Sequence, residues 1–126
     1  MWVKYVKNTK LLMQLFNNVP ELKDVEIEQF NMNYYGRKIN IIIRLPQLID
    51  EIPLKWKQNN FNAALIEMDF WDVTQFVMSM DNNRKSKINI NINKNDDILL
   101  VEIQGGINAK FSSVGGYIQN VSGYCL

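Results

Sequence analysis

Residues 88–93 read Ile-Asn-Ile-Asn-Ile-Asn, an alternation of apolar and polar side chains without a fault. Successive side chains of a β-strand point to opposite faces of a sheet, so this pattern predicts a strand with one buried and one solvated face. The same period of two recurs in further runs, with apolar residues at Ile39, Ile41, Ile43 and Leu45, and at Ala64, Ile66, Met68 and Phe70. The chain is therefore predicted to be mainly β.

Turn signals divide the chain into about seven or eight strands. Residues 25–28 and 30–32 alternate out of phase with each other, which predicts a β-bulge near Glu28 and Gln29. Short turns are predicted at Tyr35-Gly36-Arg37, Asp81-Asn82-Asn83, Asn95-Asp96-Asp97 and Gly105-Gly106. The paired glycines permit the positive φ angles of a two-residue turn. Because parallel pairing requires long crossover connections, the strands should form an antiparallel meander.

One segment has a helical period. Leu11, Leu12, Leu15 and Phe16 recur on one side of a helix, which Pro20 ends. This predicts one short N-terminal α-helix packed on the sheet. Residues 46–62 contain two prolines and no clear period, which is typical of a loop. A length of 126 residues suits one core, so the fold class is mainly β (α+β) in a single domain, residues 1–126.

Composition excludes several classes of function. The chain has no histidine, which is the commonest general base and zinc ligand. A lone Cys125 cannot form an internal disulfide, suits a reducing cytoplasm and is predicted to be buried. A net charge of +1 creates no field that would attract nucleic acid or an acidic membrane. We therefore expect a cytoplasmic protein without cofactor or metal, with no signal peptide and no membrane-spanning segment.

Two carboxylates stand out on one predicted strand. Glu67 and Asp69 are two residues apart and should share a face, which is compatible with acid–base catalysis. Carboxylates at this spacing also occur on the solvated faces of many antiparallel sheets, so catalysis is the less favoured reading. With Trp71 and Asp72 beside them, they could instead form an acidic and aromatic contact patch.

Other polar clusters have simpler explanations. Lys55 and Lys57 flank Trp56, and basic residues recur in the segment 84–87, a pattern that could contact a nucleic-acid backbone. Neither group is long, and charged ends that keep a β-sheet soluble are the commoner reason for such residues. The residues 95–97 lack the ligand spacing of a calcium loop and are predicted to form a turn.

Several short motifs, taken in order, resemble those of the bacterial immunity protein 50 family. They are a leading helix that runs into Leu15-Phe16, Lys55-Trp56 before a strand ending near Phe70, Phe-Ser-Ser at 111–113 and Val-Ser-Gly-Tyr-Cys at 121–125. Together they span nearly the whole chain. The resemblance implies a non-catalytic, mainly β protein, encoded beside a polymorphic toxin, that binds this toxin in the cytoplasm of the producing cell.

The expected partner is thus a cognate protein toxin, and the expected contacts are aromatic anchors in an acidic surround, because interface hot spots favour tryptophan and tyrosine. These candidate residues are Tyr34, Tyr35, Trp56 and Trp71, with Glu67, Asp69 and Asp72. Core packing is the alternative for each aromatic residue. The second function considered is a β-barrel-like protein that binds a small apolar ligand, suggested by six methionines and many large apolar residues.

Overall fold

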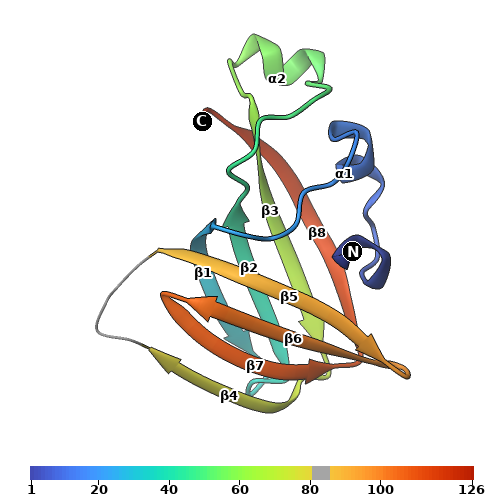
Figure 1. Ribbon diagram of the computed structural model, residues 1–126, viewed down its shortest axis with the longest axis vertical. Coiled ribbons are helices and arrows are strands. Elements are labelled where there is room, and N and C mark those ends of the chain that lie inside the picture. Colours follow the sequence, from blue (N-terminus) through green and yellow to red (C-terminus); the bar gives the residue numbers. More distant parts are fainter. Residues whose placement is uncertain (81–85) are drawn as a thin grey trace.

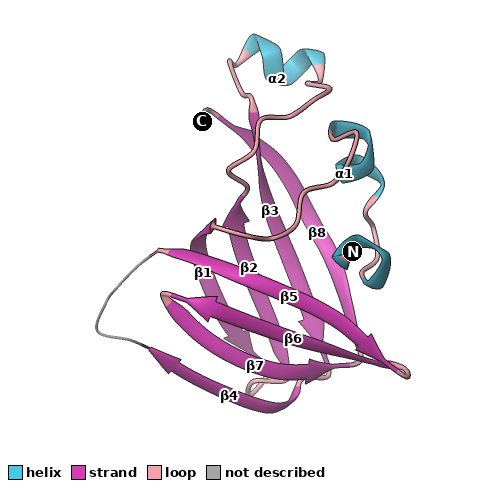
Figure 2. Cartoon of the chain, viewed as in Figure 1, coloured by secondary structure: helices cyan, strands magenta, loops and turns pink. Residues whose placement is uncertain are grey.

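The computed structural model describes residues 1–80 and 86–126, which contain one antiparallel sheet of eight strands. The sheet order is β4-β7-β6-β5-β1-β2-β3-β8 (Figures 1 and 2). The strands are β1 (Val25–Asn33), β2 (Lys38–Arg44), β3 (Ala63–Trp71), β4 (Thr74–Met80), β5 (Lys87–Asn95), β6 (Ile98–Gly105), β7 (Ile107–Ser113) and β8 (Gly115–Tyr124). The predicted mainly β, antiparallel fold is confirmed.

The sheet folds onto itself to form two layers. In Figure 1, β1, β2, β3 and β8 run together behind β5, β6, β7 and β4, which cross in front of them. The layers join where β5 pairs with the start of β1 at Val25↔Ile88 and Glu26↔Lys87. Between the layers, the rings of Phe70 and Phe111 meet edge to face with centroids 5.5 Å apart. The core therefore lies between the two halves of one sheet.

The meander is interrupted twice. β1, β2 and β3 pair in chain order, as do β5, β6 and β7, but β4 pairs with β7 and β8 pairs with β3. The chain leaves the back layer after Trp71, where Asp72 has a positive φ of 50°, and returns to it between Ser113 and Gly115. Apolar alternation predicts which face of a strand is buried, but it does not determine the neighbouring strand.

Of two detailed predictions for the strands, the bulge in β1 is confirmed and the turn at Gly105-Gly106 is not. The bulge in β1 is confirmed by a register shift between Ile27 and Gln29. The two-residue turn at the paired glycines is wrong. Gly105 still belongs to β6, where it pairs with Ile88, and the pairing of β6 with β7 starts only at Ile103↔Ala109. The loop is therefore longer than two residues, and within it the N–H of Gly106 donates to the carbonyl of Lys87 in β5.

Two short helical segments near the N-terminus contribute buried side chains to the core. A 3₁₀-helix, η1 (Trp2–Tyr5), precedes α1 (Lys10–Leu15). Leu12 and Leu15 of α1 are buried as predicted, whereas Leu11, predicted on the same apolar side, is exposed. A further helix, α2 (Leu54–Gln58), forms inside the segment predicted as a loop. Pro53 presets the backbone before α2, but five residues are too few to show a helical period. The predicted N-terminal helix is confirmed, and α2 is a second short helix that the sequence pattern did not predict.

Several sequence predictions concern residues that the structure does not describe. The predicted turn at Asp81-Asn82-Asn83, and Arg84 and Lys85 of the basic group, lie outside the described residues. Within the described ranges, no helix combines the length and the apolar character needed to cross a membrane.

Candidate partner-binding face

The back layer has one face packed on the core and one face without a second layer in the described part of the chain. Along β2, Ile39, Ile41 and Ile43 are fully buried, whereas Lys38 and Arg44 point to the opposite side and are partly exposed. We call this opposite side of β1, β2, β3 and β8 the outer face. Strand pairing aligns its residues in rows, so side chains from four strands meet there.

A polar hollow of about 410 Å³ lies in the outer face. Nearly all of its lining groups are amides or charged side chains: Gln29, Asn31, Asn33, Lys38, Asn40, Ile42, Glu67, Asp69 and Gln119. Asn40 is 8% exposed and Asp69 is 7% exposed, so the floor of the hollow is polar and buried. We call it the Asn40 hollow. A buried polar floor requires a complete set of hydrogen bonds.

A chain of amides supplies those hydrogen bonds. The Asn31 side-chain nitrogen donates to Gln29 Oε1 at 3.2 Å and to Asn40 Oδ1 at 3.0 Å. The Asn40 nitrogen in turn donates to Glu67 Oε2 at 2.8 Å and to Asp69 Oδ1 at 2.7 Å. An amide nitrogen carries only two hydrogens, so Asn40 uses both of them to hold the two carboxylates together.

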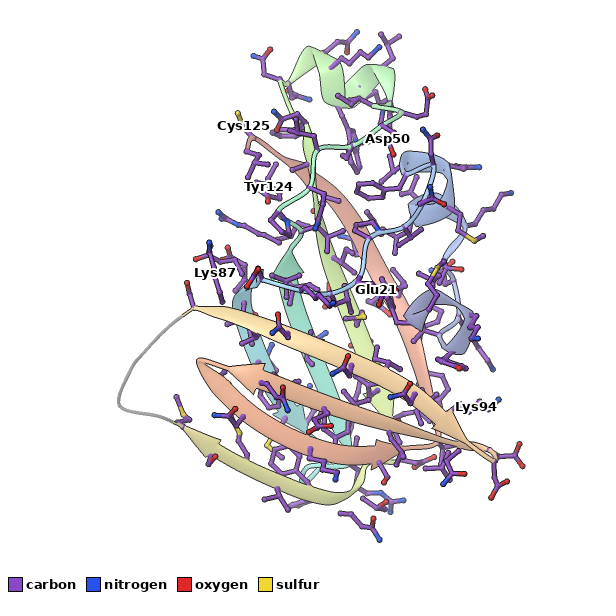
Figure 3. The ribbon with its side chains drawn as sticks, viewed as in Figure 1. Glu21, Asp50, Lys87, Lys94, Tyr124 and Cys125 are labelled. Carbon is purple, nitrogen blue, oxygen red and sulfur yellow. The ribbon has the colours of Figure 1, made fainter. Side chains whose placement is uncertain are left out.

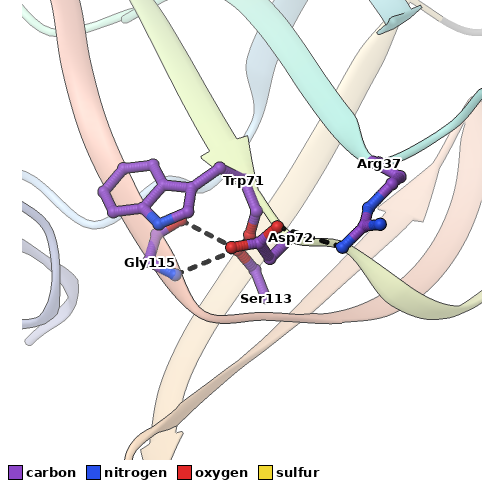
Figure 4. Close-up of polar contacts among 5 residues, drawn as sticks. All are labelled: Arg37, Trp71, Asp72, Ser113 and Gly115. Atoms are coloured by element: carbon purple, nitrogen blue, oxygen red, sulfur yellow. Dashed lines mark hydrogen bonds and ion pairs between the residues drawn. The ribbon is translucent and has the colours of Figure 1, made fainter. Parts of the chain in front are cut away.

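Trp71 lies beside the hollow, over a glycine of the neighbouring strand. A Cβ atom at Gly115 would lie 2.2 Å from Cζ2 of Trp71, so only glycine leaves room for the indole ring (Figure 4). The Ser113 hydroxyl lies 2.7 Å from the Trp71 carbonyl oxygen and accepts a hydrogen bond from the Gly115 N–H at 3.2 Å. The ammonium group of Lys7 lies 5.9 Å from the centre of the ring. The predicted contact residue Trp71 is therefore half-buried and fixed in place.

The turn between β1 and β2 projects two tyrosines. Tyr34 is 73% exposed and Tyr35 is 109% exposed. Both have a positive φ, 54° and 58°, and the Gly36 N–H donates to the Asn33 carbonyl at 3.1 Å, as in a type I′ turn. The neighbouring Arg37 carbonyl accepts from the backbone N–H of the chain after β3, so this turn lies at the Trp71 end of the outer face.

The other end of the outer face is formed by Tyr124, Arg44 and Glu28. Arg44 pairs with Glu28, and its guanidinium lies 5.2 Å from the centre of the Tyr124 ring. The Tyr124 hydroxyl donates to the Leu45 carbonyl. Burial raises the pKa of Tyr124 above its ordinary value; Arg44 opposes this effect, whereas Glu26 and Glu28 add to it.

Replacement of Tyr124 by phenylalanine tests this site. Because its pKa is raised in the folded state, Tyr124 contributes stability below about pH 10, and this contribution is lost as the pH rises through the folded pKa. Tyr124→Phe removes the hydrogen bond to the Leu45 carbonyl and should therefore lower the free energy of unfolding by about 1 kcal/mol at pH 7. The deficit should shrink above about pH 10. Thermal unfolding across pH 7–11 measures both effects, and Tyr35→Phe, which removes an exposed hydroxyl, should leave the melting temperature at pH 7 unchanged.

The structure brings together six of the seven predicted contact residues. Glu67, Asp69 and Trp71 lie on the outer face, while Tyr34, Tyr35 and Asp72 stand at its rim; Asp72 pairs there with Arg37 at 3.3 Å (Figure 4). The exception is Trp56, which lies in α2 at the opposite end of the molecule, half-buried against the core (Figure 1).

Sequence reasoning missed the centre of the hollow and misplaced the cysteine. Asn40 interrupts a run of isoleucines on a strand, and this pattern could have marked it as a polar residue on the face opposite the core. Cys125 is exposed near the C-terminal end of β8, so the prediction that it is buried is wrong (Figure 3). The alternation ends before Cys125, and a single residue beyond a strand carries no signal of its burial.

The fold and the outer face together describe a small, mainly antiparallel β protein with an open, polar surface. Among the described residues, no group of three cysteine, aspartate or glutamate side chains could hold a metal ion. Comparison with models of protein families gives a match to Immunity protein 50 over residues 8–124. The chain therefore belongs to the immunity protein 50 family, as its motifs indicated. Comparisons with curated proteins and with solved structures gave no significant match.

Proposed function

We propose that this protein binds a cognate polymorphic toxin in the cytoplasm of the producing cell and neutralises it by forming a stable complex. The family match is the observation that carries this proposal. The open outer face, with two exposed tyrosines at its rim, provides a surface of the kind that protein interfaces use. The lone cysteine suits a reducing compartment.

Neutralisation by binding alone agrees with the chemistry of the outer face. Glu67 and Asp69 both accept a hydrogen bond from the Asn40 amide, which holds them as a pair of acceptors. The chain has no histidine that could work with either carboxylate as a general base. We therefore infer that the protein occupies a surface that the toxin needs and does not modify the toxin.

Titration distinguishes the two modes of action. A binding protein needs one copy for each toxin molecule, so toxin activity should fall linearly and reach zero at a molar ratio of about one. An enzyme would neutralise many toxin molecules per copy. Calorimetry with the toxin domain encoded in the neighbouring gene should give a dissociation constant of about 1 nM or less. Complete neutralisation at a small fraction of equimolar protein would contradict the binding mechanism.

The ligand-binding alternative receives no support from the hollow described above. Sites for apolar small molecules are lined mainly by hydrophobic side chains, whereas the Asn40 hollow is lined by amides and charged groups. Met68 is fully buried in the core between the layers, and several other methionines are exposed on the surface. Core packing accounts for Met68, and the exposed methionines are isolated apolar residues of a kind common on protein surfaces.

A further inference from the structure

The Asn40 hollow holds more negative charge than it neutralises. Its charged lining groups are Glu67, Asp69 and Lys38, which leaves one net negative charge. Lys38 lies 3.5 Å from Asp69 Oδ2. Glu67 takes part in no ion pair among the described residues. A cation entering the hollow would therefore meet an unneutralised carboxylate.

The acceptors in the hollow have capacity to spare. A carboxylate offers about four lone-pair sites, yet Glu67 accepts only one hydrogen bond from the described residues, from Asn40 to its Oε2. Its second oxygen accepts no hydrogen bond there and is not among the fully buried, unpartnered atoms of the described residues. Gln29, Asn31 and Gln119 line the same hollow, and each carries an amide oxygen that can accept hydrogen bonds. A guanidinium group, with five donors in a plane, matches several acceptors at once.

The neighbouring turn places two tyrosines at backbone positions that do not suit this residue type, and both of their rings are exposed. Type I′ turns favour Asn-Gly at the two central positions, because both residues need a positive φ. Here those positions are Tyr34 and Tyr35. Left-handed backbone is unfavourable for tyrosine, and exposed rings gain nothing from burial in the free protein. The position of the turn, at the Trp71 end of the outer face, supplies aromatic surface next to the hollow.

We propose that the outer face is the toxin-binding surface and that it receives an arginine side chain from the toxin in the Asn40 hollow. The guanidinium lies against Glu67 and Asp69, and Tyr34 and Tyr35 pack on the apolar surface around it. The inference rests on the proposed function, because it names the surface and the partner chemistry of the same complex. Its observations are independent of the family match: a net negative hollow, a carboxylate with a free oxygen and an exposed aromatic turn.

Two variants test the two parts of the surface. Glu67→Gln with Asp69→Asn removes two negative charges, while the new amide oxygens still accept the hydrogen bonds from Asn40. It should weaken toxin binding about tenfold or more. The matched control, Asp96→Asn with Asp97→Asn, makes the same change of charge in the exposed β5–β6 turn. The control should bind within about twofold of the wild type.

The second variant separates binding from folding. Tyr34→Asn with Tyr35→Gly installs the preferred type I′ residues and removes both rings, so the melting temperature should stay equal or rise. Toxin affinity should nevertheless fall about 30-fold or more if the rings are anchors. Calorimetry against the toxin domain from the neighbouring gene measures all affinities.

The outcomes separate this inference from the proposed function. No complex with the wild-type protein would refute the proposed function itself. A tight wild-type complex that both variants leave unchanged would refute the outer face as the toxin-binding surface, with the proposed function intact. Loss of affinity in the tyrosine variant alone would refute an arginine in the hollow, and equal loss in the Asp96 and Asp97 control would show that only overall charge matters.

Discussion

Replacement of Ile90 by aspartate is expected to abolish cooperative folding. Ile90 is 3% exposed in β5 and pairs with Ile103, which is also buried. An unpaired carboxylate in this core costs several kcal/mol, through desolvation of the charge or through its protonation and the lost apolar contacts. A domain of this size has a total stability of about 5–15 kcal/mol, so the variant should be largely unfolded. Circular dichroism during heating should show no cooperative transition.

The control for this experiment lies three residues further along the same strand. Asn93 is exposed, on the face of β5 that points away from the core, so Asn93→Asp adds the same carboxylate to solvent. This variant should unfold within a few degrees of the wild type. A normal melting temperature for Ile90→Asp would show that this face of β5 is not buried, and it would contradict the two-layer arrangement.

The buried faces of the strands could be predicted from the sequence, because a half-buried strand shows an alternation of apolar and polar residues within a short segment. Ile39, Ile41 and Ile43 alternate with polar or partly exposed residues, and each is fully buried. The order of the strands in the sheet produces no such local pattern. Whether β8 pairs with β7 or with β3 depends on contacts between residues far apart in the chain, such as Asp69 and Tyr117. The helix α2 was missed for a different reason, since five residues are shorter than two helical turns.

The candidate site could be predicted only in part, and the reason is geometric. Glu67, Asp69 and Trp71 were singled out correctly as residues of one face, because they alternate along one strand. Asn31 and Asn40 come from two other strands, and only the register of the sheet brings them to the carboxylates. The separation of Trp56 from the others likewise follows from the tertiary structure, as α2 lies beyond the end of the sheet (Figure 1).

The glycine beneath Trp71 can be tested with a single methyl group. At Gly115, a Cβ atom would lie 2.2 Å from Cζ2 and 2.7 Å from Cε2 of Trp71, well inside van der Waals contact. The φ of Gly115 is not in the left-handed region, so alanine meets no backbone penalty there. Gly115→Ala should therefore lower the free energy of unfolding by about 2 kcal/mol through overpacking. Denaturant unfolding followed by circular dichroism measures this loss.

A double-mutant cycle assigns that loss to the indole ring. Trp71→Ala removes the ring, so the added methyl group of Gly115→Ala should cost less than about 0.5 kcal/mol in this background. The coupling energy between the two positions should thus be about 1.5 kcal/mol or more. An equal cost of Gly115→Ala in both backgrounds would show that the ring does not pack on Gly115. If the coupling is found, the strand β8 holds Trp71 in place beside the Asn40 hollow, and the orientation of this aromatic residue is fixed before any partner binds.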